Sequence, residues 1–145
     1  MRVVDANVLL YAVNEDAPQH DASREWLDRA LSGEDTVGFA WVAMLAFARL
    51  STRGDIFAHP LSPGEAFSQL DDWVCAPGGR VVHPGERHLG ILSSLLAELG
   101  LGGNLVNGAH LAALALEHRA SVVSYDSDFT RFSGLRSHTP AQLLR

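Results

Sequence analysis

The sequence predicts an α/β protein in which a central parallel sheet is covered by helices on both faces. Two short apolar runs, residues 2–5 and 121–125, have the length and composition of strands buried on both sides. Apolar residues between these runs recur at helical spacing. Buried strands that alternate with helices are typical of a three-layer α/β/α sandwich.

Four strands and six helices are predicted in all. The strands are the two apolar runs and two weaker candidates, residues 36–39 and 80–83. The helices cover residues 21–31, 41–50, 62–73, 87–99 and 107–118, and a short last helix opens at Thr139. The third helix has the clearest start, because Ser62 and Glu65 stand at the spacing of a capping box. Gly100 ends the fourth, and the nearly all-apolar fifth is expected at the centre.

Length and composition predict a single domain spanning residues 1–145. The chain is 47% hydrophobic and 19% charged, which is the balance of a packed protein, and it contains no repeat or linker. No apolar run approaches the roughly 20 residues needed to cross a bilayer. Asp5 interrupts the amino terminus where a signal peptide is apolar, so we expect a cytoplasmic protein that does not bind membranes. The single cysteine, Cys75, excludes an internal disulfide and is expected to be buried.

The charged residues exclude some functions. All 11 positively charged side chains are arginine, which rules out a Walker-A phosphate loop and Schiff-base chemistry because both need a lysine. The net charge of −6 argues against a protein that binds nucleic acid through its overall charge. The net charge does not exclude a protein that binds RNA locally, through metal ions and a few arginines.

Aspartates follow the two clearest strands. Asp5 ends the first strand, Asp126 follows the last, and Asp128 comes two residues later. Because the carboxyl ends of parallel strands meet at one edge of a sheet, we expect these carboxylates to lie together. Hard oxygen ligands of this kind suit Mg²⁺ or Mn²⁺, and such an ion can activate water for attack on a phosphate.

The same aspartates also have a structural interpretation. An aspartate after a strand often caps a helix, which by itself explains Asp5, and Asp126 and Asp128 could form an ordinary turn. Their occurrence after both strands of one small domain favours a site. Asn7, Ser124 and Arg49 are weaker candidates for binding RNA or metal-bound water, since each can instead cap a turn or remain solvated.

Three motifs in the chain resemble those of PIN domains. Residues 4–12 read Val-Asp-Ala-Asn-Val-Leu-Leu-Tyr-Ala and resemble the opening of a PIN domain. Residues 104–115 resemble the stretch that carries another family acid, and residues 123–132 resemble the closing acidic motif. The order and spacing of the motifs are most similar to VapC toxins of the mycobacterial type, over essentially the full length.

The resemblance implies a toxin of a toxin–antitoxin pair that cuts single-stranded or looped RNA with Mg²⁺ or Mn²⁺. Asp5, Asp126 and Asp128 would then be the catalytic, metal-binding residues. It also implies a homodimer and a VapB-type antitoxin whose peptide blocks the active-site groove. The apolar helices at residues 41–50 and 62–73 are where we expect the dimer to form.

Gly108 departs from the family pattern. The pattern reads Asp-Ala-His-Leu-Ala-Ala at the start of the central helix, and Gly108 stands where that Asp belongs. Glycine supplies no ligand and weakens a helix by up to about 1 kcal/mol relative to alanine. Ala46 and Phe47 stand near the place where many PIN domains carry a glutamate.

Gly108 therefore leaves an alternative function open, a PIN domain that binds antitoxin or RNA without cutting. A phosphatase of the haloacid dehalogenase type is disfavoured. Its first strand would end in Asp-x-Asp with a lysine downstream, whereas this chain has Asp5-Ala6-Asn7 and no lysine.

Overall fold

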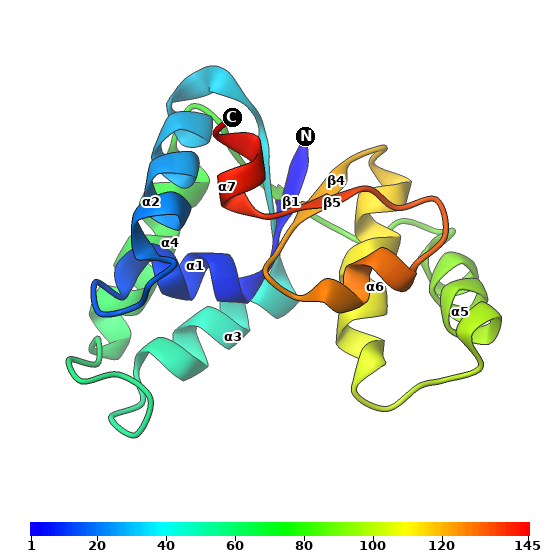
Figure 1. Ribbon diagram of the computed structural model, residues 1–145, viewed down its shortest axis with the longest axis horizontal. Coiled ribbons are helices and arrows are strands. Elements are labelled where there is room, and N and C mark those ends of the chain that lie inside the picture. The colour runs from blue at the N-terminus through cyan, green and yellow to red at the C-terminus, as the bar shows by residue number, and fades with distance from the viewer.

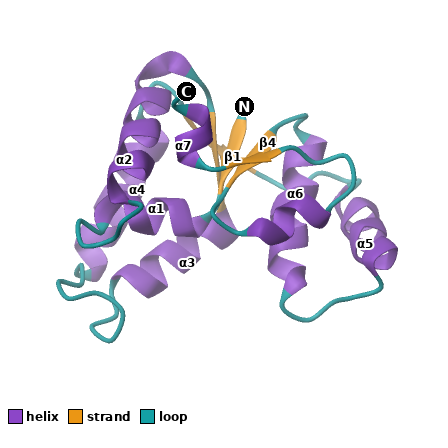
Figure 2. Ribbon diagram, viewed as in Figure 1, coloured by secondary structure: helices purple, strands orange, loops and turns teal.

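The computed structural model describes all 145 residues and contains one sheet of five parallel strands. The strands are β1 (Arg2–Val4), β2 (Val37–Ala40), β3 (Gly79–Val82), β4 (Ser121–Val123) and β5 (Ser137–His138). Their order across the sheet is β3-β2-β1-β4-β5. Figure 2 shows the strands at the centre of the molecule, with helices to either side. The central strand β1 pairs with both β2 and β4, so the carboxyl ends of these three strands are neighbours.

Helices cover both faces of the sheet, which confirms the predicted three-layer α/β/α sandwich. The α-helices are α1 (Ala6–Val13), α2 (His20–Arg29), α3 (Trp41–Ser51), α4 (Pro63–Cys75), α5 (His88–Leu99), α6 (Leu105–Glu117) and α7 (Pro140–Leu143). A π-helical turn at Ala30–Glu34 follows α2, and a 3₁₀ turn at Ser127–Arg131 follows β4. Helices α1, α2 and α4 lie on one side of the strands, with α5 and α6 on the other (Figure 1). None of the helices is both long and apolar enough to span a membrane.

The sheet separates two hydrophobic cores. Val4 of β1 enters the first core together with Phe39 and Trp73, and Val3 enters the second together with Leu114. Val3 and Val4 are both fully buried, as expected for a strand whose alternate side chains point to opposite faces. Burying a large apolar side chain such as Phe39 contributes about 1.5–3 kcal/mol to folding.

The boundaries of the predicted elements are confirmed to within two residues. The capping box at the start of α4 is present, because Ser62 Oγ accepts the Glu65 backbone N–H at 3.1 Å and Glu65 Oε1 accepts the Ser62 N–H at 3.0 Å. Gly100 adopts the left-handed conformation that ends α5, with φ of +66°. Local capping signals therefore locate the ends of these helices.

The sequence analysis did not predict α1 and β5, and its expectation for Cys75 was wrong. Helix α1 is short and mainly apolar and follows β1 after only one residue, Asp5, and β5 has only two residues, both polar. Backbone bonds hold the β5 segment beside β4, from Val122 N–H to the Arg136 carbonyl at 2.9 Å and from Ser124 N–H to the His138 carbonyl at 3.0 Å. Cys75 is exposed at the last position of α4.

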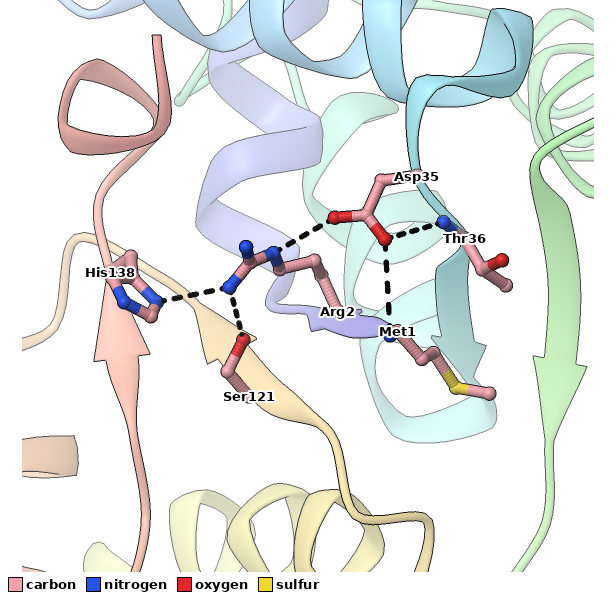
Figure 3. A network of polar contacts seen from close by, with 6 residues as sticks. All are labelled: Met1, Arg2, Asp35, Thr36, Ser121 and His138. Carbon is pink, nitrogen blue, oxygen red and sulfur yellow. Dashed lines mark hydrogen bonds and ion pairs between the residues drawn. The ribbon is translucent and has the colours of Figure 1, made fainter. Parts of the chain in front are cut away.

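Arg2 joins the amino-terminal ends of several strands (Figure 3). Its Nε donates to Asp35 Oδ2 at 3.0 Å, and its Nη1 donates to Ser121 Oγ at 2.9 Å and lies 3.5 Å from His138 Nδ1. The amino group of Met1 lies 3.8 Å from Asp35 Oδ1. This network fixes one edge of the sheet, and the opposite edge carries the candidate site.

Candidate active site

Asp5 and Asp126 lie at the carboxyl edge of the sheet, where the adjacent strands β1 and β4 end. Val4 and Val123, the last residues of these strands, are paired in the parallel ladder. Both aspartates line one cavity of about 210 Å³ between α3 and α6. The other residues around this cavity are Ala6, Val42, Ala43, Ala46, Asn104, Asn107, Gly108, Leu111 and Phe129. The structure thus brings together two of the three predicted acids.

Ser124 holds the two aspartates in place. Its hydroxyl donates to Asp5 Oδ2 at 2.7 Å and accepts the backbone N–H of Asp126 at 2.9 Å. Asn7 adds three further bonds. Its Nδ2 donates to Ser124 Oγ at 3.1 Å and to Asp5 Oδ2 at 3.4 Å, and its Oδ1 accepts the Tyr125 N–H at 3.2 Å. The hydrogen bonds of Asn7 and Ser124 therefore go to protein atoms, and these residues position the acids.

Each aspartate also caps the turn that follows it. Asp5 Oδ1 accepts the Ala6 N–H at 2.7 Å at the start of α1, and Asp126 Oδ1 accepts the Asp128 N–H at 2.9 Å at the start of the 3₁₀ turn. Each aspartate therefore both caps a turn and lines the cavity. The cap fixes the direction of each carboxylate toward the cavity.

The carboxyl group of Asp5 is in an environment that disfavours negative charge. Burial raises the pKa of Asp5, hydrogen bonds from Ser124 and Ala6 lower it, and the neighbouring charge of Asp126 raises it, with a net increase. No arginine or histidine is among the residues that line the cavity. Two carboxylates without a cationic partner are an arrangement that a bound cation would stabilise.

Asp128 and Arg49 lie outside the cavity lining. Asp128 is half-exposed on the 3₁₀ turn, and its Oδ1 is 3.6 Å from Arg131 Nη1. Arg49 is exposed near the end of α3. No three His, Cys, Asp or Glu side chains lie close enough together to hold a metal ion. The side chain of Asn104, which the sequence analysis did not single out, does line the cavity, and its only sequence signal is its place just before the central helix.

Comparison with known proteins identifies the family. The family model described as "PIN domain" matches residues 2–135. The chain belongs to the PIN-domain family. Ribonuclease VapC37 of Mycobacterium tuberculosis is 57% identical over 99% of this chain and 100% of its own length, and Ribonuclease VapC31 of the same species is 39% identical over 97% and 99%. In the crystal structure of VapBC2 from Rickettsia felis bound to a promoter DNA fragment, one chain shares the fold with a TM-score of 0.69 at 18% identity, covering 95% of this PIN domain and 97% of that chain.

Gly108 leaves open space in the first turn of α6 of this PIN domain. A β-carbon at this position would meet only ring atoms of Phe129 and Phe132, both at 3.9 Å, which is ordinary van der Waals contact. The first turn of α6 contains no acidic residue, and no side chain caps its amino terminus. The positive end of the helix dipole, which an aspartate would complement, is therefore uncompensated beside the cavity.

The donor groups around the cavity fit a hard divalent cation. Asp5 and Asp126 offer carboxylate oxygens, and Asn104 and Asn107 offer amide oxygens from the start of α6. Mg²⁺ commonly uses one or two protein carboxylates and keeps several waters, so this small donor set is sufficient for weak binding.

Proposed function

We propose that this PIN domain is a divalent-metal-dependent endoribonuclease and the toxin component of a type II toxin–antitoxin pair. The observation that carries the proposal is the pairing of Asp5 and Asp126 in one cavity that has no cationic side chain. The names of the relatives, Ribonuclease VapC37 and Ribonuclease VapC31, support RNA as the substrate and favour catalysis over the alternative of a non-cutting binding module.

In this proposal Asp5 and Asp126 hold Mg²⁺ or Mn²⁺, and Ser124 and Asn7 keep their carboxylates in position. The chemistry that such an ion supplies when bound is activation of water and stabilisation of the charge that develops on a phosphate oxygen. Asp128 is a proposed further ligand, and its carboxylate would leave Arg131 to reach the cavity. Exposed Arg49 is proposed to contact RNA phosphate.

The proposed partners are a VapB-type antitoxin, RNA and a second copy of this chain. The similarity to a chain of the VapBC2 structure supports the antitoxin, which would cover the active-site groove. The homodimer is supported by large apolar side chains that are about half-exposed on neighbouring helices, Trp41 and Leu45 on α3 and Phe67 on α4. A toxin that cleaves cellular RNA would act in the cytoplasm.

RNA cleavage by the wild type and a Gly108→Asp variant, each with Mg²⁺ and with EDTA, tests the proposed activity. We expect slow, Mg²⁺-dependent cleavage by the wild type, because the site lacks one carboxylate. Gly108→Asp should raise the Mg²⁺-dependent rate by at least about tenfold, the lower end of the effects of mutations that tune metal sites. Asp126→Asn introduced into the Gly108→Asp chain should abolish the gain.

Gly90→Asp is the matched control, because Gly90 also lies near the start of a helix, with open space around it, but outside the cavity. It should leave the rate at the wild-type level. A folded Gly108→Asp variant that leaves RNA intact would overturn the ribonuclease proposal in favour of a binding module. A wild type that cleaves as fast as Gly108→Asp would show that position 108 is not part of the metal site.

A further inference from the structure

A second cluster of titratable side chains lies between α5 and α6, which run side by side (Figure 1). His88 is the first residue of α5, and His110 and Glu117 lie two turns apart on α6. His88 Nδ1 is 2.5 Å from Glu117 Oε1, and His88 Nε2 is 2.8 Å from His110 Nδ1. The side chains of His88 and Glu117 are each only 11% exposed. Both ring nitrogens of His88 are therefore engaged in a contact that is largely closed to water.

Glu117 also binds the loop that precedes α5. Its Oε2 accepts the Gly85 backbone N–H at 2.9 Å. A β-carbon at position 85 would lie 2.6 Å from this oxygen, so the close approach of the carboxylate requires glycine there. A carboxylate at the carboxyl end of α6 is disfavoured by the dipole of its own helix, and it is stabilised here by donors at the start of α5. The cluster thus joins the start of α5 to the end of α6.

The hydrogen-bond partners of His88 and His110 determine which nitrogen of each ring carries a hydrogen. A carboxylate only accepts hydrogen bonds, so the hydrogen between His88 and Glu117 lies on His88 Nδ1. When both rings are neutral, His88 Nε2 is an acceptor and His110 donates from Nδ1. With one additional proton, His88 donates from both nitrogens and His110 accepts. A second additional proton would place an N–H group on both facing nitrogens, which would break the contact between the rings.

Other charged or titratable side chains lie around the cluster. Glu86 and Arg87 before α5, together with Arg119 after α6, border a cavity beside Glu117. His118 is exposed, with Nε2 3.3 Å from the His83 carbonyl oxygen. On the 3₁₀ turn packed against α6, Asp128 and Arg131 face each other. None of these groups makes a hydrogen bond or ion pair with His88 or His110.

We propose that His88, His110 and Glu117 form a proton-operated clamp, which holds α5 against α6 near neutral pH and releases it in acid. Residues 100–104 connect the two helices, and Asn104 at the end of this connection lines the candidate active site. The clamp needs neither metal nor RNA, so its test is independent of the proposed nuclease activity.

The direction of the pH effect follows from His110. Burial lowers the pKa of His110 below its ordinary value of 6.5, the charge of His88 lowers it further, and Glu117 opposes this decrease. In the window between 6.5 and the lowered value, the unfolded chain binds more protons than the folded protein. The stability that the clamp contributes is therefore complete above this window and is lost as the pH falls through it.

Two measurements on the full chain test the clamp. Long-range ¹H–¹⁵N NMR at about pH 7.5, where histidines are largely neutral, should show His110 with its hydrogen on Nδ1. Hydrogen exchange followed by mass spectrometry, corrected for intrinsic rates, should show residues 88–104 opening at least about fivefold more readily at about pH 5 than at about pH 7.5, the effect of losing one ordinary hydrogen bond. Hydrogens on both ring nitrogens of His110 at about pH 7.5, or unchanged opening of this segment in acid, would overturn the proposal.

Variants separate the clamp from general acid destabilisation. His110→Asn should remove the acid response of residues 88–104, because an asparagine cannot take up the second proton, the one that breaks the contact with His88. His118→Asn, a matched change nearby on an exposed histidine, should retain the response. Gly85→Ala, which displaces the Glu117 carboxylate, should raise exchange of the segment already at about pH 7.5. An acid response that persists in His110→Asn would contradict the clamp, and if that variant does not fold, the protonation of the His110 ring in the wild type decides.

Discussion

At Gly108, the cavity has room for a side chain that this chain does not supply. The nearest atoms to a β-carbon there, on Phe129 and Phe132, are 3.9 Å away, so an aspartate would enter without displacing its neighbours. Mg²⁺ is held mainly by ligand charge, and the raised pKa of Asp5 indicates that the negative charge already present is costly without a cation. We therefore expect a side chain at position 108 to affect metal affinity more than folding.

The Gly108→Asp variant should therefore be stabilised by Mg²⁺ more than the wild type. A ligand that binds only the folded state contributes about 2.7 kcal/mol when its concentration is 100 times its Kd, and tighter binding extends this effect to lower concentrations. Differential scanning calorimetry in EDTA and in rising MgCl₂ measures the increase in Tm. The increase should be larger for Gly108→Asp than for the wild type, with Gly90→Asp equal to the wild type. Equal increases in all three proteins would remove position 108 from the metal site.

The sequence predicted that Asp5 and Asp126 would lie together, as they do around one cavity, but it did not predict which side chains hold them there. The aspartates were predictable because both follow buried strands, and parallel strands share one carboxyl edge. The role of Ser124 was not predictable, because Ser124 and Asp5 are 119 positions apart in the chain. Their side chains meet only because β1 pairs with β4. A side chain's hydrogen-bond partners depend on this tertiary pairing and leave no local pattern.

At the scale of elements, the ends of helices follow local signals and the short edge strand does not. The capping box of α4 consists of reciprocal bonds between Ser62 and Glu65 and was visible in the sequence. Strand β5 has no apolar alternation and forms because the backbone of residues 136–138 pairs with β4. Helix α1 was missed for a different reason, since its apolar residues follow β1 directly and blur the period of both elements.

The capping box makes a measurable prediction for α4. Ser62→Ala removes the acceptor for the Glu65 N–H and should lower the free energy of unfolding by about 1 kcal/mol, the typical cost of losing an N-cap side chain. Urea unfolding followed by circular dichroism measures this change. Ser68→Ala is the matched control, because Ser68 is exposed within the same helix and makes no capping bond. Equal urea midpoints for the two variants would mean that the cap contributes nothing to stability.

At the scale of the whole molecule, the two edges of the sheet have different roles. The amino-terminal edge is tied together by Arg2 and its partners (Figure 3), whereas the carboxyl edge keeps its carboxylates without a cationic partner. The layered fold was predictable because its strands are apolar on both faces, which requires helices on each side. The surface proposed to join two copies was predictable only as an excess of apolar residues on two helices, since a partner's contacts are not encoded in one chain's periodicity.

The predicted homodimer should form through the exposed apolar side chains of α3 and α4. Trp41, Leu45 and Phe67 are each about half-exposed, and burying such a group against a second copy would remove apolar surface from water. Multi-angle light scattering at micromolar concentrations should give twice the chain mass of 15.6 kDa. Leu45→Glu should shift the protein toward the monomer, because association would then bury an unpaired charge. Leu89→Glu changes a more exposed leucine on α5, at the other side of the sheet, and should leave the mass unchanged. A wild type with the mass of a single chain would contradict the dimer. A dimer that Leu89→Glu breaks and Leu45→Glu does not would place the interface elsewhere.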